Sequence, residues 1–374
     1  MVSALLWGGA PFSSAPSSTL FAATTPEWNK GVGYLGTMLN PKGASIDAKN
    51  VAELLDFVVS ANGTNAQLDP GRRDNATGAY FFFNVNAPLA KVIKYAYNPN
   101  IPSHLTLPTS VRLGGWRVNP GGPIDSLWER VGNVREPLVM RGEEYEEITP
   151  DLTTGGYYRY ETNRLMVLLN HQGKDFFISV TDQQKPSSVG RKGAIIGPDT
   201  DWNYFYSGQR GLSKSGLGWA SSYMYSAFSV VILFEPDTAK GQTRYVTFKW
   251  LRAGWGGINM VQRENILEGC QRFAQGFRTV MESPQLPEAQ SLIDTYAKIK
   301  SMSDQELSAR LQPVEKALMA LCRTDAALKR RDFQDLIESG EYLTAMSREE
   351  RESLLMSESF KLAIGKKSFL DRMP

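Results

Sequence analysis

Hydrophobic and polar residues alternate along much of the first 282 positions in a pattern that predicts strands. The runs are rich in β-branched and aromatic residues and are bounded by turn-forming residues. They cover residues 79–85, 90–97, 105–113, 164–169, 175–181, 223–234 and 243–251. The clearest hairpin has its turn at Asn170–Gly173, between two of these runs. Successive strands with helices at either end favour a mostly antiparallel sheet.

Helical spacing of apolar residues marks the two ends of this strand-rich part. The segment 47–60 reads as a helix, with Ser45 at its start and Asn62-Gly63 after its end. A second helix is predicted over 259–280, after the glycines between 254 and 257 break the strand pattern. The fold class is therefore predicted to be α+β.

A change in composition near Pro284–Pro287 divides the chain. Residues 283–374 contain 2 of the 33 glycines and no tryptophan, and 29 of these 92 residues are charged. Such a composition favours helices over strands and loops. We predict three parts: a leader at 1–23, a β-rich α+β body at 24–282, and a helical C-terminal region at 283–374.

The C-terminal region carries clear helix punctuation and predicts four short helices. Ser303–Glu306 and Ser347–Glu350 are capping boxes, and Gly340 ends a helix between them. Pro313 is a candidate kink in the helix that follows the first box. That helix carries an apolar stripe at helical spacing, formed by Leu307, Leu311, Val314, Leu318 and Leu321. An exposed stripe here would dock a partner protein, whereas a buried one would not.

The first residues resemble the end of a secretory signal. A short apolar run at 2–7 precedes a small, Pro- and Ser-rich stretch, and the sequence turns polar at Thr24. No Lys or Arg precedes the run, so a leader of a cytoplasmic protein is the alternative. We expect export to the periplasm or the cell exterior.

Charge and composition exclude several functional classes. The net charge is only +2, and the basic run at 329–331 is followed at once by Asp332, so nucleic-acid binding is not expected. No apolar run is long enough to span a membrane. Two cysteines, Cys270 and Cys322, cannot form a zinc site, and are expected to be core side chains unless they pair in an oxidising compartment. With two histidines, His104 and His171, most histidine-based sites are excluded, and no cofactor is expected.

Two glycine-rich motifs lack the context that their chemistry needs. Residues 31–36 match G-x-G-x-x-G, but a polar segment with Pro26 stands where a strand should precede it, so a glycine-rich loop is predicted. Residues 208–216 approach a phosphate loop and a nucleophile elbow, yet Ser213 and Ser215 occupy positions that require glycine. A mobile loop between two strands is the simpler interpretation.

Acidic residues give weak candidates for catalysis and metal binding. The run Glu143–Glu147 is predicted to be a solvated strand edge or loop. Asp199 and Asp201 could supply calcium ligands, but the terminal acidic ligand of an EF-hand loop is missing, so no metal site is predicted. Glu161, Asp199 or Asp201 could act as paired catalytic carboxylates if the fold brought two of them into one cleft. The catalytic residues therefore stay unassigned.

Aromatic residues crowd the region between 157 and 255, with amides and arginine among them. Alternation would place the rings of Trp202, Tyr204 and Tyr206 on one side of a strand. A flat aromatic face beside hydrogen-bonding groups suits a carbohydrate, a peptide or a small aromatic ligand. The alternative is that these rings are core and cross-strand pairs of the sheet. The predicted ligand-binding residues are Trp202, Tyr204, Tyr206, Arg210, Trp219 and Trp255.

Two functional classes follow from these patterns. The first is an exported binding or interaction protein that uses the aromatic face. The second is a secreted hydrolase or lyase that acts on a glycan-like polymer through paired carboxylates. Two carboxylates in one aromatic cleft, one of them with a raised pKa, would favour the enzyme.

Overall fold

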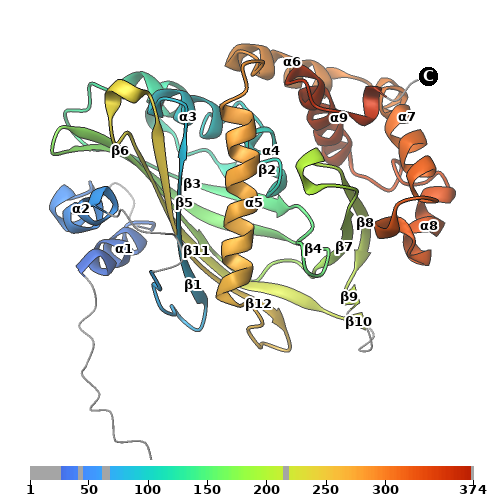
Figure 1. The fold of residues 1–374 in the computed structure, drawn as a ribbon, viewed down its shortest axis with the longest axis horizontal. Coiled ribbons are helices and arrows are strands. Elements are labelled where there is room, and N and C mark those ends of the chain that lie inside the picture. Colours follow the sequence, from blue (N-terminus) through green and yellow to red (C-terminus); the bar gives the residue numbers. More distant parts are fainter. Residues whose placement is uncertain (1–26, 41–44, 61–67, 214–218, 372–374) are drawn as a thin grey trace, which may run out of the picture.

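The chain is built around a seven-stranded antiparallel sheet, seen in the computed structural model (Figure 1). The structure describes residues 27–40, 45–60, 68–213 and 219–371. In spatial order the strands are β1 (Thr77–Val85), β12 (Thr243–Trp255), β11 (Ser222–Phe234), β6 (Lys174–Gln183), β5 (Arg159–His171), β3 (Leu138–Ile148) and β2 (Val111–Val118). The mostly antiparallel α+β fold predicted from the hydrophobic pattern is confirmed.

The central hairpins form where the sequence predicts them. Strands β5 and β6 pair up to His171 and Lys174, which leaves a two-residue turn. Both turn residues, Gln172 and Gly173, have positive φ angles of 50° and 75°. Turns of this kind match the right-handed twist of the strands they join. Strands β11 and β12 pair along almost their whole length, as the two apolar runs around 235–241 predict.

One face of the sheet, here called the outer face, is covered by α1 (Glu27–Thr37) and α2 (Ala52–Ser60) (Figure 1). The predicted glycine-rich loop at 31–36 is wrong, because these residues lie within α1. Trp28, Val32 and Leu35 lie at helical spacing and are buried, which makes α1 amphipathic. Gly31 allows close approach to α2: a Cβ at this position would lie 2.8 Å from the Cβ of Leu54.

The opposite face, called the inner face, includes the side chains of Phe83, Met166 and Leu233 and packs against α3 (Leu89–Ala96), α4 (Ser103–Thr106) and α5 (Arg263–Met281). The strand predicted at 90–97 is wrong: these residues form most of α3. Its buried residues, Leu89 and Val92 among them, follow helical rather than alternating spacing. The strand predicted at 105–113 is only partly correct, because α4 ends at Thr106 and β2 begins at Val111.

Shorter elements complete the described part of the body. A three-stranded sheet contains β4 (Gly156–Tyr157), β7 (Arg191–Ile195) and β8 (Tyr204–Arg210), and a short hairpin pairs β9 (Leu212–Ser213) with β10 (Trp219–Ala220). The predicted loop at 208–216 is therefore strand at its start, while 214–218 lie outside the described residues. The 3₁₀ helices are Ala48–Asn50, Gly122–Arg130, Asp199–Asp201, Thr238–Lys240, Ala326–Leu328 and Phe369–Asp371.

The C-terminal region forms the four α-helices expected in the described chain: α6 (Ala289–Ser301), α7 (Asp304–Leu321), α8 (Arg331–Glu338) and α9 (Arg348–Ala363). Both capping boxes are present, at Ser303 and Ser347. Pro313 lies inside α7 without splitting it. In Figure 1 these helices gather beside β7 and β8, away from α1 and α2.

The apolar stripe of α7 is buried rather than exposed. Leu307, Leu311, Val314 and Leu318 belong to the same hydrophobic cluster as Phe83 of the body. The C-terminal helices and the inner face of the sheet therefore share one core. The stripe leaves no free surface for the partner protein that its exposure would have indicated.

The cysteines and the helix lengths complete the picture of the fold. Cys270 in α5 and Cys322 at the end of α7 are buried free thiols, so they are core side chains and do not pair. Across the described ranges, the helices lack the combination of length and apolar character that a membrane crossing needs.

Candidate functional site

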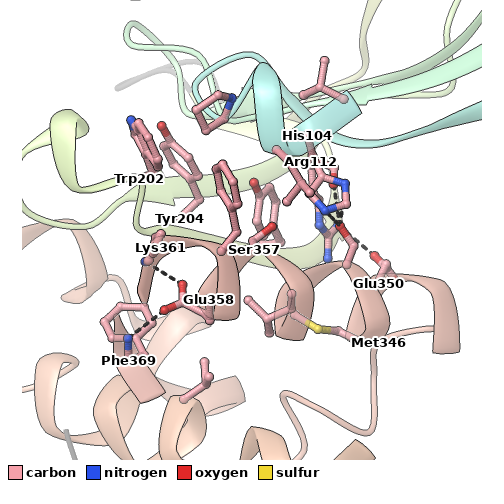
Figure 2. A pocket seen from close by; sticks show the side chains of 18 of the residues that line it. His104, Arg112, Trp202, Tyr204, Met346, Glu350, Ser357, Glu358, Lys361 and Phe369 are labelled. Atoms are coloured by element: carbon pink, nitrogen blue, oxygen red, sulfur yellow. Dashed lines mark hydrogen bonds and ion pairs between the residues drawn. The ribbon is translucent and has the colours of Figure 1, made fainter. Parts of the chain in front are cut away.

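Three residues of the predicted aromatic face lie buried where the body meets the C-terminal helices. Trp202, Tyr204 and Tyr206 have 7%, 9% and 9% of their surface exposed. Tyr204 and Tyr206 share one side of β8, with ring centroids 6.4 Å apart, whereas Trp202 precedes the strand in a left-handed turn. Figure 2 shows the rings of Trp202 and Tyr204 facing α9. All three aromatic residues line a small cavity of ≈ 60 Å³ at this junction. That space suits ordered water rather than a sugar or a peptide.

The remaining predicted site residues do not join these three. Arg210 is exposed at the end of β8. Trp219 lies in β10, but its side chain is outside the described part of the structure. Trp255 is 44% exposed at the end of β12. The proposed aromatic residues therefore do not converge on one cleft among the described side chains.

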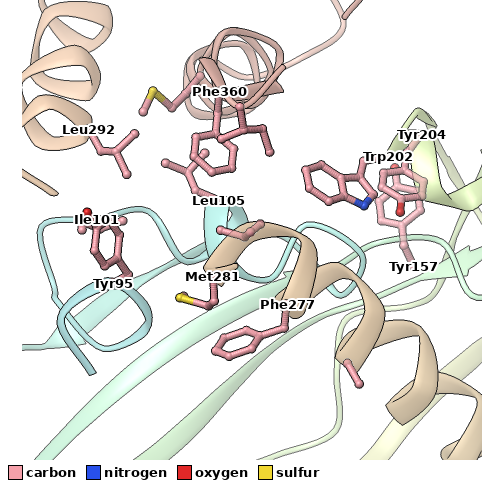
Figure 3. Packing of buried hydrophobic residues seen from close by; sticks show 14 of the residues in the cluster. Tyr95, Ile101, Leu105, Tyr157, Trp202, Tyr204, Phe277, Met281, Leu292 and Phe360 are labelled. Carbon is pink, nitrogen blue, oxygen red and sulfur yellow. The ribbon is translucent and has the colours of Figure 1, made fainter. Parts of the chain in front are cut away.

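The rings at the junction are packed on both sides of β8. Phe205, on the other side of the strand, stacks on Tyr342 with ring centroids 4.9 Å apart. Figure 3 shows Trp202 and Tyr204 in the cluster that also holds Phe360 of α9 and Phe277 of α5. This arrangement agrees with the alternative that the rings are core pairs.

Buried charges stabilise the same junction. Arg112 of β2 lies between two carboxylates, with Nη1 2.6 Å from Glu147 and 2.8 Å from Glu350 of α9. Figure 2 shows Arg112 beside Glu350. Its guanidinium also lies over the ring of Tyr206, 3.8 Å from the centroid. Burial alone would raise the pKa of Glu350, but Arg112 holds it below its usual value. Lys361 donates to Asn203 at 2.7 Å, which ties α9 to the start of β8.

The carboxylates predicted as catalytic candidates are engaged in separate ion pairs. Asp199 receives two hydrogen bonds from Arg272 of α5, at 2.7 and 2.8 Å. Glu161 pairs with Arg117 and, at 3.1 Å, with Lys185. Asp201 lies in the 3₁₀ helix at 199–201. Among the described residues, no three His, Cys, Asp or Glu side chains gather as metal ligands.

A much larger cavity of ≈ 570 Å³ lies between the inner face of the sheet and the helices α5, α6 and α9. We call it the sheet cavity. Its size falls within the range of small-molecule sites in proteins. Nine aromatic residues contribute to the lining, and they are Tyr97, Trp116, Tyr145, Tyr160, Phe228, Tyr245, Phe273, Phe277 and Tyr296.

The floor of the sheet cavity is a row of polar side chains on four neighbouring strands. Arg164 of β5 lies opposite Thr181 of β6, Thr181 opposite Ser229 of β11, and Ser229 opposite Lys249 of β12. Residues directly opposite in an antiparallel pair project to the same face. The hydroxyl oxygens of Thr181 and Ser229 lie 2.6 Å apart. The inner face of the sheet therefore changes from an apolar core under α3 to a polar surface at the floor of the sheet cavity.

The acidic end of the sheet cavity is built by β3 and β5. Arg164 pairs with Glu144, lies 3.7 Å from Glu146 and donates to Ser179 at 2.6 Å. The hydroxyl of Tyr160 donates to Glu146 at 2.7 Å. Burial raises the pKa of Glu144 even though Arg164 opposes that shift. Two carboxylates, one with a raised pKa, therefore share a cavity lined by aromatic rings.

The run Glu143–Glu147 is not the solvated edge that the sequence predicts. It lies within β3, which pairs with β2 on one side and β5 on the other. Glu144 and Glu147 are buried, with 9% and 2% of their surface exposed. Their charges are balanced by Arg164 and Arg112, which lie far away in the sequence. A run of adjacent acids reveals nothing about such distant partners.

A signal for the floor was nevertheless present in the sequence. Polar residues recur at every second position in the first half of β5, at Tyr160, Thr162 and Arg164. From Leu165 to Leu169 the strand is apolar on both faces. Ser179 and Thr181 repeat this spacing in β6. Positions two apart lie on the same face of a strand, so this spacing gathers the polar residues on one face of the sheet.

The sequence matches no known family model, and the search of curated proteins finds no relative. The case for a function therefore depends on the geometry of the sheet cavity.

Proposed function

We propose that this protein binds a small organic molecule in the sheet cavity. The observation that carries the proposal is the combination of ≈ 570 Å³ of space, a ring of aromatic side chains and a polar floor. A folded protein would gain stability by packing this space with apolar side chains, as it does under α3. Tyrosines offer apolar surface and a hydroxyl together, which suits ligands with mixed character.

The tyrosine lining is neutral and held in place. Burial raises the pKa of Tyr97, Tyr160 and Tyr245, so their hydroxyls stay protonated at neutral pH. The ring of Tyr97 packs against Phe177 with centroids 4.4 Å apart. Fixed rings and neutral hydroxyls lose little conformational freedom when a ligand binds. This supports a pre-formed site.

Filling the sheet cavity tests the proposal. Ala227 of β11 lines the cavity, and Ala227→Phe would place a ring in it. Ala239→Phe adds the same ring on an exposed turn and serves as the matched control. The ligand panel contains oligosaccharides, short peptides and aromatic molecules, beginning with the uncharged dye N-phenyl-1-naphthylamine. We expect saturable binding to the wild type and to Ala239→Phe, and binding at least about tenfold weaker to Ala227→Phe. Equal binding to all three proteins would contradict the proposal.

A second candidate function is cleavage of a glycan-like polymer, either by hydrolysis or by the elimination reaction of a lyase, with Glu144 and Glu146 as the carboxylates. The observation that favours it is the raised pKa of Glu144 beside a second carboxylate. Turnover of oligosaccharides by the wild type, lost in both Glu144→Gln and Glu146→Gln, would support the enzyme. Binding without turnover by the wild type favours the binding protein.

We also propose that the protein is exported. The support is the apolar run at 2–7 and the small residues after it, all of which lie outside the described residues. N-terminal sequencing of the mature protein tests this: a chain that begins near Thr24 and is found outside the cytoplasm is expected. A cytoplasmic chain that retains residue 2 would contradict it.

A further inference from the structure

We propose that the ligand of the sheet cavity carries an anionic group, a carboxylate or a phosphate, that binds Lys249 and the hydroxyls of Ser229 and Thr181. This inference rests on the proposed binding function and names the chemical class of its ligand. The expected ligand is an aromatic or otherwise apolar molecule with one anionic group.

Lys249 supplies the positive charge of the proposed site. The side chain is half-buried in the floor of the sheet cavity. Among the described residues it forms no ion pair, whereas Lys192 and Lys361, which are also buried, each pair with a carboxylate. Partial burial removes part of the hydration of an ammonium, and a nearby anion compensates for that loss. An anion bound at this point would restore the balance.

The thiol of Cys270 in α5, an ionisable group that interacts with Lys249, does not supply that counter-ion. Lys249 interacts electrostatically with the thiol of Cys270 in α5. Burial raises the pKa of this thiol, so at neutral pH it carries no charge. A neutral thiol leaves the positive charge of Lys249 uncompensated.

Two hydroxyls extend the site from Lys249 along the floor. Ser229 lies opposite Lys249 on the neighbouring strand, and its hydroxyl oxygen is 2.6 Å from that of Thr181. Only one of the two hydroxyls can donate within this pair, so the other hydrogen is free to donate to a ligand oxygen. An ammonium with an adjacent hydroxyl donor is a suitable partner for a carboxylate or phosphate oxygen.

The opposite end of the floor has no such capacity. Arg164 is shared between Glu144 and Glu146, and it also donates to Ser179. The acidic end would repel a second anion, whereas the Lys249 end would attract it. The charges of the floor therefore favour one orientation of an anionic ligand, with its charged group at β11 and β12.

A pair of dyes separates this inference from the proposed function. N-phenyl-1-naphthylamine is uncharged, and 8-anilinonaphthalene-1-sulfonate has the same aromatic skeleton with one negative charge. We expect the wild type to bind the sulfonate more tightly than the neutral dye. In Lys249→Met the affinity for the sulfonate should fall at least about tenfold, while the affinity for the neutral dye stays within about twofold.

Two further variants act as controls. Lys249→Arg keeps the charge and should retain the preference for the sulfonate. Lys240→Met removes a lysine from an exposed turn and should leave both affinities unchanged. Circular dichroism confirms that each variant is folded. If Lys249→Met does not fold, the preference of the wild type, measured at low and high salt, provides the test, because binding at Lys249 should weaken as salt rises.

Each outcome has a distinct meaning. Binding of both dyes with equal affinity, unchanged in Lys249→Met, would overturn the anion site and leave the proposed function standing. If neither dye binds in the sheet cavity, as equal signals in Ala227→Phe and the wild type would show, both the anion site and the proposed function are overturned.

Discussion

At the scale of single residues, the fold depends on buried charged and ionisable side chains where the C-terminal helices meet the sheet. Arg112, Glu147 and Glu350 form one group, and His104 lies next to it on the same small cavity. Buried charges are costly unless they are paired, so each partner in such a group depends on the others. Two predictions follow from this environment.

The first concerns the Arg112 ion pairs. Arg112→Met would leave the carboxylates of Glu147 and Glu350 in a buried environment without their cation, and we expect a loss of about 3–5 kcal/mol in the free energy of unfolding. Arg331→Met removes an exposed pair with Asp335 and should change stability by less than about 0.5 kcal/mol. Urea unfolding monitored by tryptophan fluorescence measures both. A similar small change in the two variants would contradict the structure of this junction.

The second concerns acid stability. Burial lowers the pKa of His104 to about 3. Below about pH 6.5 the unfolded chain takes up a proton that the folded chain does not accept, so stability falls as the pH drops through this window. Between pH 7 and pH 5 the contribution of His104 to this loss is about 2 kcal/mol.

Comparison with His104→Gln measures that contribution. The variant should lose about 2 kcal/mol less than the wild type between pH 7 and pH 5, since it removes the titrating group. His171→Gln, at the β5–β6 turn, should still show the loss of stability that His104 causes between pH 7 and pH 5. Parallel curves for the wild type and His104→Gln would show that His104 accepts a proton in the folded state.

At the scale of elements, local patterns predicted the hairpins, α2, α5 and the C-terminal helices, but not α1 and α3. The β5–β6 hairpin follows from turn residues and alternation, which are local properties. Segment 90–97 contains β-branched and aromatic residues, yet it folds as α3 because its buried residues repeat every three or four positions. The glycines of α1 led to the prediction of a loop, although the segment is an amphipathic helix. Gly31 occurs in this helix because it allows close contact with α2.

Two of the three glycines of α1, Gly31 and Gly33, give a paired prediction with opposite signs. At Gly31 a Cβ would lie 2.8 Å from the Cβ of Leu54, so Gly31→Ala should destabilise the protein by about 1–3 kcal/mol through overpacking. At Gly33 no atom lies within 4 Å of the added Cβ, and Gly33→Ala should stabilise the helix by up to about 1 kcal/mol. Thermal unfolding of both variants checks the pair. Stabilisation by both substitutions would indicate that α1 does not pack on α2 as described.

The candidate site was less predictable than the fold, for a physical reason. The Trp202, Tyr204 and Tyr206 cluster was visible because its members are neighbours in the sequence, but neighbouring rings pack into a core as readily as they bind a ligand. The floor of the sheet cavity joins Arg164 to Lys249 across four strands. Such a row depends on strand order and register, which one sequence does not contain.

At the scale of the whole molecule, the body and the C-terminal helices share one hydrophobic core. Phe333 of α8 packs against Phe205 of β8 with ring centroids 4.9 Å apart, and only 1% of its surface is exposed. The sheet cavity is lined by residues of α5, α6 and α9 as well as by residues of the sheet. The C-terminal region is therefore part of the proposed binding site as well as of the core.

A shared core predicts one cooperative unfolding transition. All eight tryptophans lie before residue 283, so their fluorescence reports on the body, while far-ultraviolet circular dichroism also reports on the C-terminal helices. Phe333→Ala should destabilise the protein by about 3–5 kcal/mol and shift both signals together. A loss of helical signal at lower urea than the fluorescence change would show that the two regions unfold independently.

A crystal structure with 8-anilinonaphthalene-1-sulfonate bound tests most directly whether the sheet cavity is the binding site. We expect density for the dye in the sheet cavity, with the sulfonate beside Lys249 and Ser229 and the rings among the tyrosines. Density found instead only at the Trp202 and Tyr204 junction, or on the exposed Trp255, would contradict the assignment of the sheet cavity as the binding site.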